Sequence, residues 1–376
     1  MSRRFFNVIA PLFVLVALST AVLRAEEDVK AKALAASDKG SKFLISQAND
    51  DGTFGKGPGA KTPGIVGIAL TGLGTTQGIT AATPAVAKAA EYIASAQKPD
   101  GSIVTSLGNE NYNTSIAVLG LKAINDPKYA SVLEKAKAYI LKCQLGPEQG
   151  YNKDEHFLAF GGFSYGSNRK PDVSNSAFAL EALKEMGLEE NSVAFKNAIV
   201  FIRRCQDSVE TNDFPGAKDG DNTGGFVYRV GDSEFDEYKA RNGKMVPKPY
   251  GNMTYSAIKS LLYCGMKADS PELQAASKWI RTNYNVKENP GGEGSEGYYY
   301  YIIAFAKAFT AMGVKEIELA DGKKVNWAKD LASHLIATQQ ADGSWVNKAS
   351  RWYESDPVLT TSYALKALNL AIKALE

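Results

Sequence analysis

One short motif recurs along this chain and constrains its fold more than any other feature. In its clearest copy, a stretch with helical character runs into Gln339, and Gly343 and Trp345 follow at Gln-x-x-x-Gly-x-Trp spacing. Degraded copies contain Gln97, Gly101 and Ile103 at the same spacing, Gln47, Gly52 and Phe54 with one residue inserted, and Gln144 and Gln206 with long insertions before Gly161-Gly162-Phe163 and Gly224-Gly225-Phe226. Recurrence of this kind predicts a repeat architecture.

Each repeat is predicted to contain a pair of helices. The first helices are expected at 28–47, 84–97, 128–144, 192–206, 271–284 and 326–340, and charged residues at intervals give them one solvated face. The second helices are expected at 63–73, 112–124, 173–186, 253–266, 297–312 and 358–375, and they are apolar almost all round, which is typical of buried helices. Six such pairs predict an all-α fold, a six-fold α/α toroid with two concentric rings of helices, in one domain over residues 28–376.

The residue types of the motif have a physical purpose. Glutamine can cap backbone groups left without partners at a helix end, and an aromatic ring can pack against the next helix. We therefore expect the Gly-aromatic loops to tie each first helix to its neighbour.

The composition excludes few classes of function. The net charge is +2 and no basic stripe appears, so no nucleic-acid partner is predicted. Cys143, Cys205 and Cys264 do not form a disulfide framework, and we expect buried free thiols.

Residues 1–25 have the layout of a signal peptide. A basic start is followed by an apolar run from 8 to 23, and Ala25 precedes an acidic stretch. Residues 2–6 also resemble a twin-arginine signal, so export by either the Sec or the twin-arginine route is open. An uncleaved anchor is a further alternative, because the apolar run is close to a membrane-spanning length. We expect a periplasmic or extracellular protein without a membrane span in its mature part.

The motif, the paired helices and the Gly-Gly-Phe loops resemble the squalene-hopene cyclase and protein prenyltransferase β-subunit superfamily. The resemblance extends over about residues 28 to 376. It implies a terpenoid cyclase-like toroid with a ligand in a central cavity, near the N-terminal ends of the inner helices.

The catalytic groups of that superfamily are replaced here. Similar cyclases protonate an isoprenoid with Asp-x-Asp-Asp, of which only Asp172 survives, and Ser174 stands where the acid would be. A serine hydroxyl cannot protonate an alkene. Asp172 also fits a helix N-cap. Similar prenyltransferases hold zinc with Asp, Cys and His, whereas this chain has Ser174 and Thr360 near the Cys and His positions, so no metal or cofactor is predicted.

A different enzyme class on α/α toroids uses paired carboxylates on polysaccharides. The loops before the expected second helices contain several carboxylates: Asp154, Glu155, Asp172, Glu293, Glu296, Glu354 and Asp356. Asp172, Glu296 and Asp356 are taken as candidate catalytic residues. Carboxylates at helix starts also stabilise the helix dipole, which is the alternative role for Glu296 and Asp356.

Four successive tyrosines, Tyr298, Tyr299, Tyr300 and Tyr301, are the most unusual run in the chain. On a helix they point in all directions, so at least one should face the cavity, where a ring could stack on a sugar or stabilise a cation. The alternative is packing between the two rings of helices. Tyr112 and Asn175, at other second-helix starts, complete the candidate ligand-binding residues.

The sequence therefore predicts an exported protein that binds an apolar ligand (an isoprenoid or lipid), a glycan or a protein partner at its cavity. In this hypothesis the catalytic acid and the zinc ligands of the superfamily have been lost. The alternative is a divergent enzyme, either a terpenoid cyclase or prenyltransferase or a polysaccharide-active hydrolase or lyase.

Overall fold

The chain is mostly helical, as the sequence predicts. The computed structural model describes residues 9–57, 59–106, 108–166, 169–233 and 237–376, with side chains from residue 27 onward. The α-helices of this part are α1 (Ile9–Ser46), α2 (Pro63–Leu73), α3 (Pro84–Ser95), α4 (Glu110–Ile124), α5 (Ala130–Cys143), α6 (Val173–Glu185), α7 (Val193–Arg204), α8 (Gly251–Tyr263), α9 (Pro271–Asn283), α10 (Tyr298–Met312), α11 (Trp327–Thr338) and α12 (Pro357–Ala374). Short 3-10 helices are η1 (Pro127–Tyr129), η2 (Pro147–Gln149), η3 (Pro215–Asp219) and η4 (Arg351–Tyr353).

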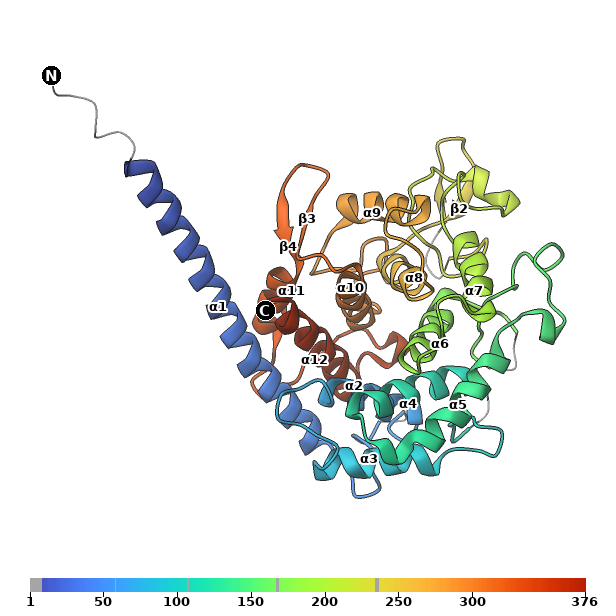
Figure 1. Ribbon diagram of the computed structural model, residues 1–376, viewed down its shortest axis with the longest axis horizontal. Helices are drawn as coiled ribbons and strands as arrows, with labels where there is room; N and C mark the ends of the chain where they lie inside the picture. Colours follow the sequence, from blue (N-terminus) through green and yellow to red (C-terminus); the bar gives the residue numbers. More distant parts are fainter. Residues whose placement is uncertain (1–8, 58, 107, 167–168, 234–236) are drawn as a thin grey trace.

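The even-numbered helices lie inside the molecule and the odd-numbered ones around them (Figure 1). In α6 every residue from Val173 to Leu183 is buried, whereas α7 alternates buried and solvated positions along its length. Each even-numbered helix contacts the next one along the chain, and α12 contacts α2. The contacts among these six helices therefore close on themselves.

The motif glutamines join neighbouring odd-numbered helices. The side-chain amide of Gln206, after α7, donates to the carbonyls of Gly224 in its own loop (3.0 Å) and Glu272 in α9 (2.9 Å). Equivalent pairs of bonds run from Gln97 to Gly101 and Val132, from Gln144 to Gly161 and Ala194, and from Gln339 to Gly343 and Ala36. The last of these links the end of α11 to α1, near the other end of the chain.

The aromatic position of each motif is also anchored to the following even-numbered helix. Its backbone N–H donates to a hydroxyl there, in the pairs Ile103–Thr114, Phe163–Ser176, Phe226–Thr254 and Trp345–Thr361. The indole of Trp345 is buried against Gly40 of α1, where an added Cβ would lie 2.7 Å from the ring. The loops thus tie three helices together.

The first copy of the motif departs from its expected alignment. Ala48, and not Gln47, forms the bridge to Phe54 that Gln97 forms to Ile103. The side chain of Gln47 donates only to its neighbour Ser46. The single inserted residue in the sequence is therefore accommodated by moving the glutamine out of the bridging position.

Two short antiparallel hairpins are additions that the helical pattern does not predict. They pair β1 (Glu237–Lys239) with β2 (Met245–Pro247) and β3 (Glu316–Glu318) with β4 (Lys324–Asn326). Both lie in connections between helices, so they leave the helical arrangement intact.

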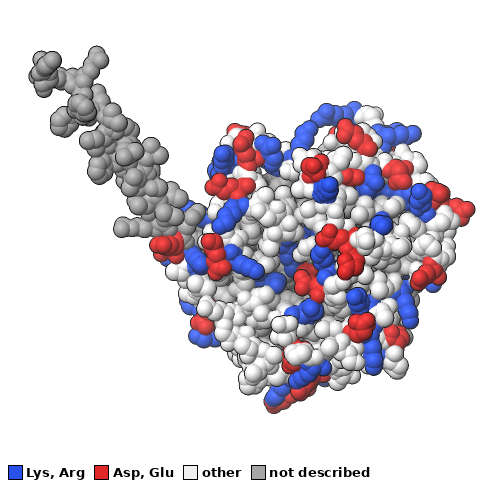
Figure 2. Space-filling model, viewed as in Figure 1, with Lys and Arg blue, Asp and Glu red and all other residues white. Residues whose placement is uncertain are grey.

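The predicted signal peptide is described only in part, and without its side chains. Residues 1–8 lie outside the described residues, and 9–26 are described only as the backbone of α1, which projects from the body (Figure 1). Among the described residues, no helix has both the length and the apolar character needed to cross a membrane. Acidic and basic side chains are intermixed over the face visible in Figure 2.

Candidate functional site

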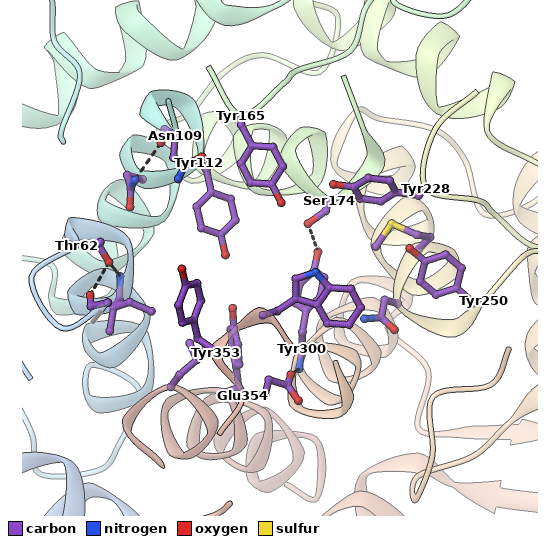
Figure 3. Close-up of a pocket in the computed structure, with 18 residues that line it drawn as sticks. Thr62, Asn109, Tyr112, Tyr165, Ser174, Tyr228, Tyr250, Tyr300, Tyr353 and Glu354 are labelled. Atoms are coloured by element: carbon purple, nitrogen blue, oxygen red, sulfur yellow. Dashed lines mark hydrogen bonds between the residues drawn. The ribbon is translucent and has the colours of Figure 1, made fainter. Parts of the chain in front are cut away.

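A cavity of about 260 Å³ opens where the even-numbered helices begin (Figure 3). Each of these helices contributes lining residues near its start: Ile65 of α2, Tyr112 and Asn113 of α4, Ser174 of α6, Asn252 and Met253 of α8, Tyr300 of α10, and Leu359 and Tyr363 of α12. Loops complete the wall with Gly59, Thr62, Asn109, Tyr165, Tyr228, Tyr250, Trp352, Tyr353 and Glu354. The described lining contains no Lys, Arg or His.

Tyrosine dominates this wall. The ring of Tyr112 lies 5.6 Å from that of Tyr165 and edge-on to Phe178 at 5.4 Å, and Phe178 in turn stacks on Tyr300 at 5.8 Å. Figure 3 shows the hydroxyl ends of Tyr112 and Tyr165 directed toward the middle of the cavity. Burial raises the pKa of both Tyr112 and Tyr300, so these phenols stay neutral.

The hydroxyl of Tyr300 is satisfied within the protein. The hydroxyls of Tyr300 and Ser174 lie 2.9 Å apart and form a hydrogen bond. Because this hydroxyl already has a partner, the ring of Tyr300 can contact an apolar ligand without leaving its hydroxyl unpaired.

The four successive tyrosines of α10 point in different directions, as the helical period requires. Tyr300 lines the cavity, whereas Tyr298 donates to the carbonyl of Val286 (2.7 Å) and Tyr299 to that of Val346 (3.3 Å). Tyr301 is buried and donates to the carbonyl of Asn285. Of the candidate ligand-binding residues, the structure therefore brings Tyr112 and Tyr300 together at one cavity.

Asp172 is the N-cap of α6. Its carboxylate accepts hydrogen bonds from the backbone and side-chain amides of Asn175, both at 2.7 Å. Burial raises the pKa of Asp172 to about 6, although these bonds oppose the shift. Neither Asp172 nor Asn175 lines the cavity, because each holds the other at the start of the helix.

Glu296 and Asp356 also lie outside the lining. Asp356 caps α12 by accepting from the backbone N–H of Val358 at 2.9 Å. Glu296 forms an ion pair with Arg351 at 2.8 Å. The three candidate carboxylates thus sit at separate helix starts and do not face one another across the cavity.

Glu354 is the only carboxylate of the described cavity wall, and sequence reasoning did not select it. It is 1% exposed and accepts from the backbone amides of Tyr300 (2.8 Å) and Tyr299 (3.2 Å) and from the side chain of Asn347 (2.6 Å). Burial raises its pKa, and the three donors oppose that shift. In the sequence it is one of several loop carboxylates, and no pattern there marks it as facing the cavity.

The histidines take no part in the cavity wall. His156 accepts from the backbone of Asn152, and His334 lies edge-on to the ring of Tyr298. Among the described residues, no group of three or more His, Cys, Asp or Glu is placed to hold a metal ion.

Comparison with known structures shows the same fold in two kinds of enzyme. A variant of the type II terpene cyclase MstE from Scytonema, with merosterolic acid A as product, is 14% identical with a TM-score of 0.55, over 93% of this chain and 99% of that chain. Another MstE variant, with geranylgeranyl dihydroxybenzoate as substrate, is 12% identical with a TM-score of 0.53, at the same coverage. An unsaturated glucuronyl hydrolase specific for heparin is 11% identical with a TM-score of 0.52, over 93% and 97% of the two chains.

Among curated proteins, none matches this sequence. The squalene-hopene cyclase C-terminal domain matches residues 59–209 and 112–363, a span that includes most of the helices and the whole cavity wall. Together with the fold, this match places the chain in the terpenoid cyclase-like superfamily, and the chain belongs to the squalene-hopene cyclase C-terminal domain family.

Proposed function

We propose that this protein binds an apolar, isoprenoid-class ligand in its tyrosine-lined cavity and has lost the catalytic acid and zinc ligands of its relatives. In this proposal residues 28–376 form a six-fold α/α toroid that is exported, behind a signal peptide, to the periplasm or the extracellular space. The observation that carries the proposal is the convergence of all six even-numbered helix starts on one aromatic cavity.

The chemistry of the wall favours a largely apolar ligand. Aromatic rings supply apolar surface, the hydroxyls of Tyr300 and Ser174 are paired with each other, and the described lining has no cationic side chain to hold a phosphate. A volume of about 260 Å³ suits a small ligand or one segment of a longer chain. The isoprenoid bound by the MstE variant supports this ligand class by analogy of fold only.

The carboxylates near the cavity are engaged as helix caps. Asp172 is held by Asn175, and Glu354 accepts three N–H bonds that stabilise its anionic form. An alkene is a very weak base, so its protonation needs a strong acid with a proton directed at it. These contacts support a binding role over an acid-initiated cyclisation.

One observation favours a second candidate function. Glu354 is a buried carboxyl group with a raised pKa in an aromatic cavity, which is an arrangement suited to proton donation. Polysaccharide cleavage receives less support, because it needs two carboxylates facing the substrate and the described wall has one.

Native mass spectrometry of the purified protein with farnesol tests the binding proposal. We expect a one-to-one adduct that is lost in Tyr300→Ala, which removes a cavity wall, and retained in Tyr299→Phe, which removes a hydroxyl outside it. Conversion of farnesol to an isomer, abolished by Glu354→Gln, would establish the enzymatic candidate instead. Adducts with glycans alone, or with a protein alone, would contradict the isoprenoid proposal.

A further inference from the structure

The residues around η4 form one wall of the cavity in an unfavourable backbone conformation. Trp352 and Tyr353 are consecutive and have φ values of 54° and 63°, the left-handed region that bulky side chains rarely adopt. Both residues line the cavity, and Tyr353 is 62% exposed. Strained conformations persist only where surrounding contacts hold them, and they concentrate at clamps and switches. We call residues 350–354 the strap.

Contacts with the start of α10 hold the strap in place. The guanidinium of Arg351 lies 4.4 Å from the centre of the Trp352 ring and forms its ion pair with Glu296, just before α10. The Trp352 ring packs over Gly297, where an added Cβ would lie 3.0 Å from it. Glu354 then fixes the end of the strap to the first amides of α10.

These contacts differ in strength along the strap. The bonds of Glu354 are buried, whereas the Arg351 and Glu296 side chains are 41% and 29% exposed, so solvent and salt weaken their attraction. Opening of the ion pair would free the strained pair Trp352 and Tyr353 to relax, while Glu354 stays anchored as a hinge. The outer half of the strap is therefore held less firmly than the end anchored by Glu354.

We propose that the strap is the gate of the cavity and that the Arg351–Glu296 ion pair is its latch. This inference rests on the proposed function, since it takes the cavity to be the ligand site. A ligand exchanges with solvent when the latch opens and the strap leaves its left-handed conformation. The latch then sets the rate of exchange and has little effect on affinity, because the cavity behind it is unchanged.

Tryptophan fluorescence can follow the strap without a ligand. The chain has four tryptophans, and Trp279, Trp327 and Trp345 are buried, whereas Trp352 is half-buried. Quenching by neutral acrylamide therefore reports mainly on Trp352. We expect Glu296→Gln to raise the quenching constant at least twofold. The matched control is Glu190→Gln, which breaks the exposed Lys184–Glu190 pair (2.7 Å) away from the cavity and should leave quenching unchanged.

Stopped-flow binding of farnesol tests the gate itself. We expect association and dissociation rates to rise together, several-fold, in Glu296→Gln, with less than a twofold change in Kd, and high salt to have the same effect on the wild type. Unchanged quenching, or increased quenching with unchanged exchange rates, would overturn the proposal. If farnesol binds no variant, the proposed function fails, and the acrylamide comparison alone decides whether the latch holds the strap.

Discussion

The carboxylate of Glu181 and the ammonium of Lys259 form a buried ion pair of 2.5 Å between α6 and α8. Lys307 of α10 approaches the other carboxylate oxygen at 2.7 Å. Burial alone would raise the pKa of Glu181, but the two lysines outweigh it and hold the pKa at about 2. One carboxylate thus joins three neighbouring even-numbered helices.

Glu181→Gln should destabilise the protein strongly, because it leaves two buried ammonium groups without a counter-charge. We expect the free energy of unfolding in urea to fall by about 3 to 5 kcal/mol. The exposed ion pair between Lys184 and Glu190 offers the control. Glu190→Gln should change the free energy of unfolding by no more than about 0.5 kcal/mol. If both substitutions change the free energy of unfolding by a similar, small amount, the buried ion pair does not stabilise the fold more than the exposed one.

Asp172 should make stability depend on pH in acid. Its folded-state pKa of about 6 exceeds the ordinary 3.8, so the folded protein binds the proton more tightly than the unfolded chain. The resulting stabilisation is fully present below 3.8 and is lost as the pH rises through about 6.

Asp172→Asn keeps an N-cap side chain and removes this proton. The unfolding free energy of the wild type, minus that of the variant, should fall by on the order of 2 to 3 kcal/mol across this pH range. Urea titrations at a series of pH values measure the difference, and a constant difference would refute the assignment.

Gln206→Ala should be costly because it removes both bonds between the end of α7 and its neighbours, to the carbonyls of Gly224 and Glu272. We expect a loss of about 2 to 4 kcal/mol in unfolding free energy. Gln47→Ala is the matched control, since its side chain reaches only Ser46, and it should change stability by less than about 0.5 kcal/mol. Equal losses at both positions would contradict the bridging role.

Because of backbone strain at Tyr353, a glycine at this position should give a more stable protein than an alanine, which is the reverse of the usual order. Glycine normally destabilises relative to alanine because the unfolded chain gains entropy. At a φ of 63°, however, alanine has a steric cost that glycine avoids. We expect Tyr353→Gly to be more stable than Tyr353→Ala by about 1 kcal/mol. Thermal unfolding of the two variants decides the sign, and the usual order would argue against strain in the strap.

Much of the fold could be predicted because periodicity reports burial directly. The second helices begin and end close to the expected residues, as at α2, where 63–73 is the observed span. Four motif glutamines, Gln97, Gln144, Gln206 and Gln339, form the expected links between helices. The motif spacing predicts the same role for Gln47, and this prediction is wrong. One inserted residue places Ala48, and not Gln47, in the bridge to Phe54.

The cavity was harder to predict than the helices. Tyr300 faces it and Tyr298 does not, and that difference depends on the rotation of α10 about its axis, which four identical residues cannot reveal. In the sequence, Glu354 is one of several loop carboxylates. Only the path of the strap brings it against the amides of Tyr299 and Tyr300.

The contact between the two ends of the chain has a consequence for biosynthesis. Ser37 of α1 donates to Asn369 of α12 across 332 positions, and Asn369 also contacts Thr76, just beyond α2. The faces of α1 and α2 that pack against α12 therefore stay uncovered until α12 has left the ribosome. Contacts this distant in sequence form late and slowly. A nascent chain lacking only its last helix would expose apolar surface at both edges of the gap, so a short C-terminal truncation should yield an aggregating polypeptide and not a smaller functional protein.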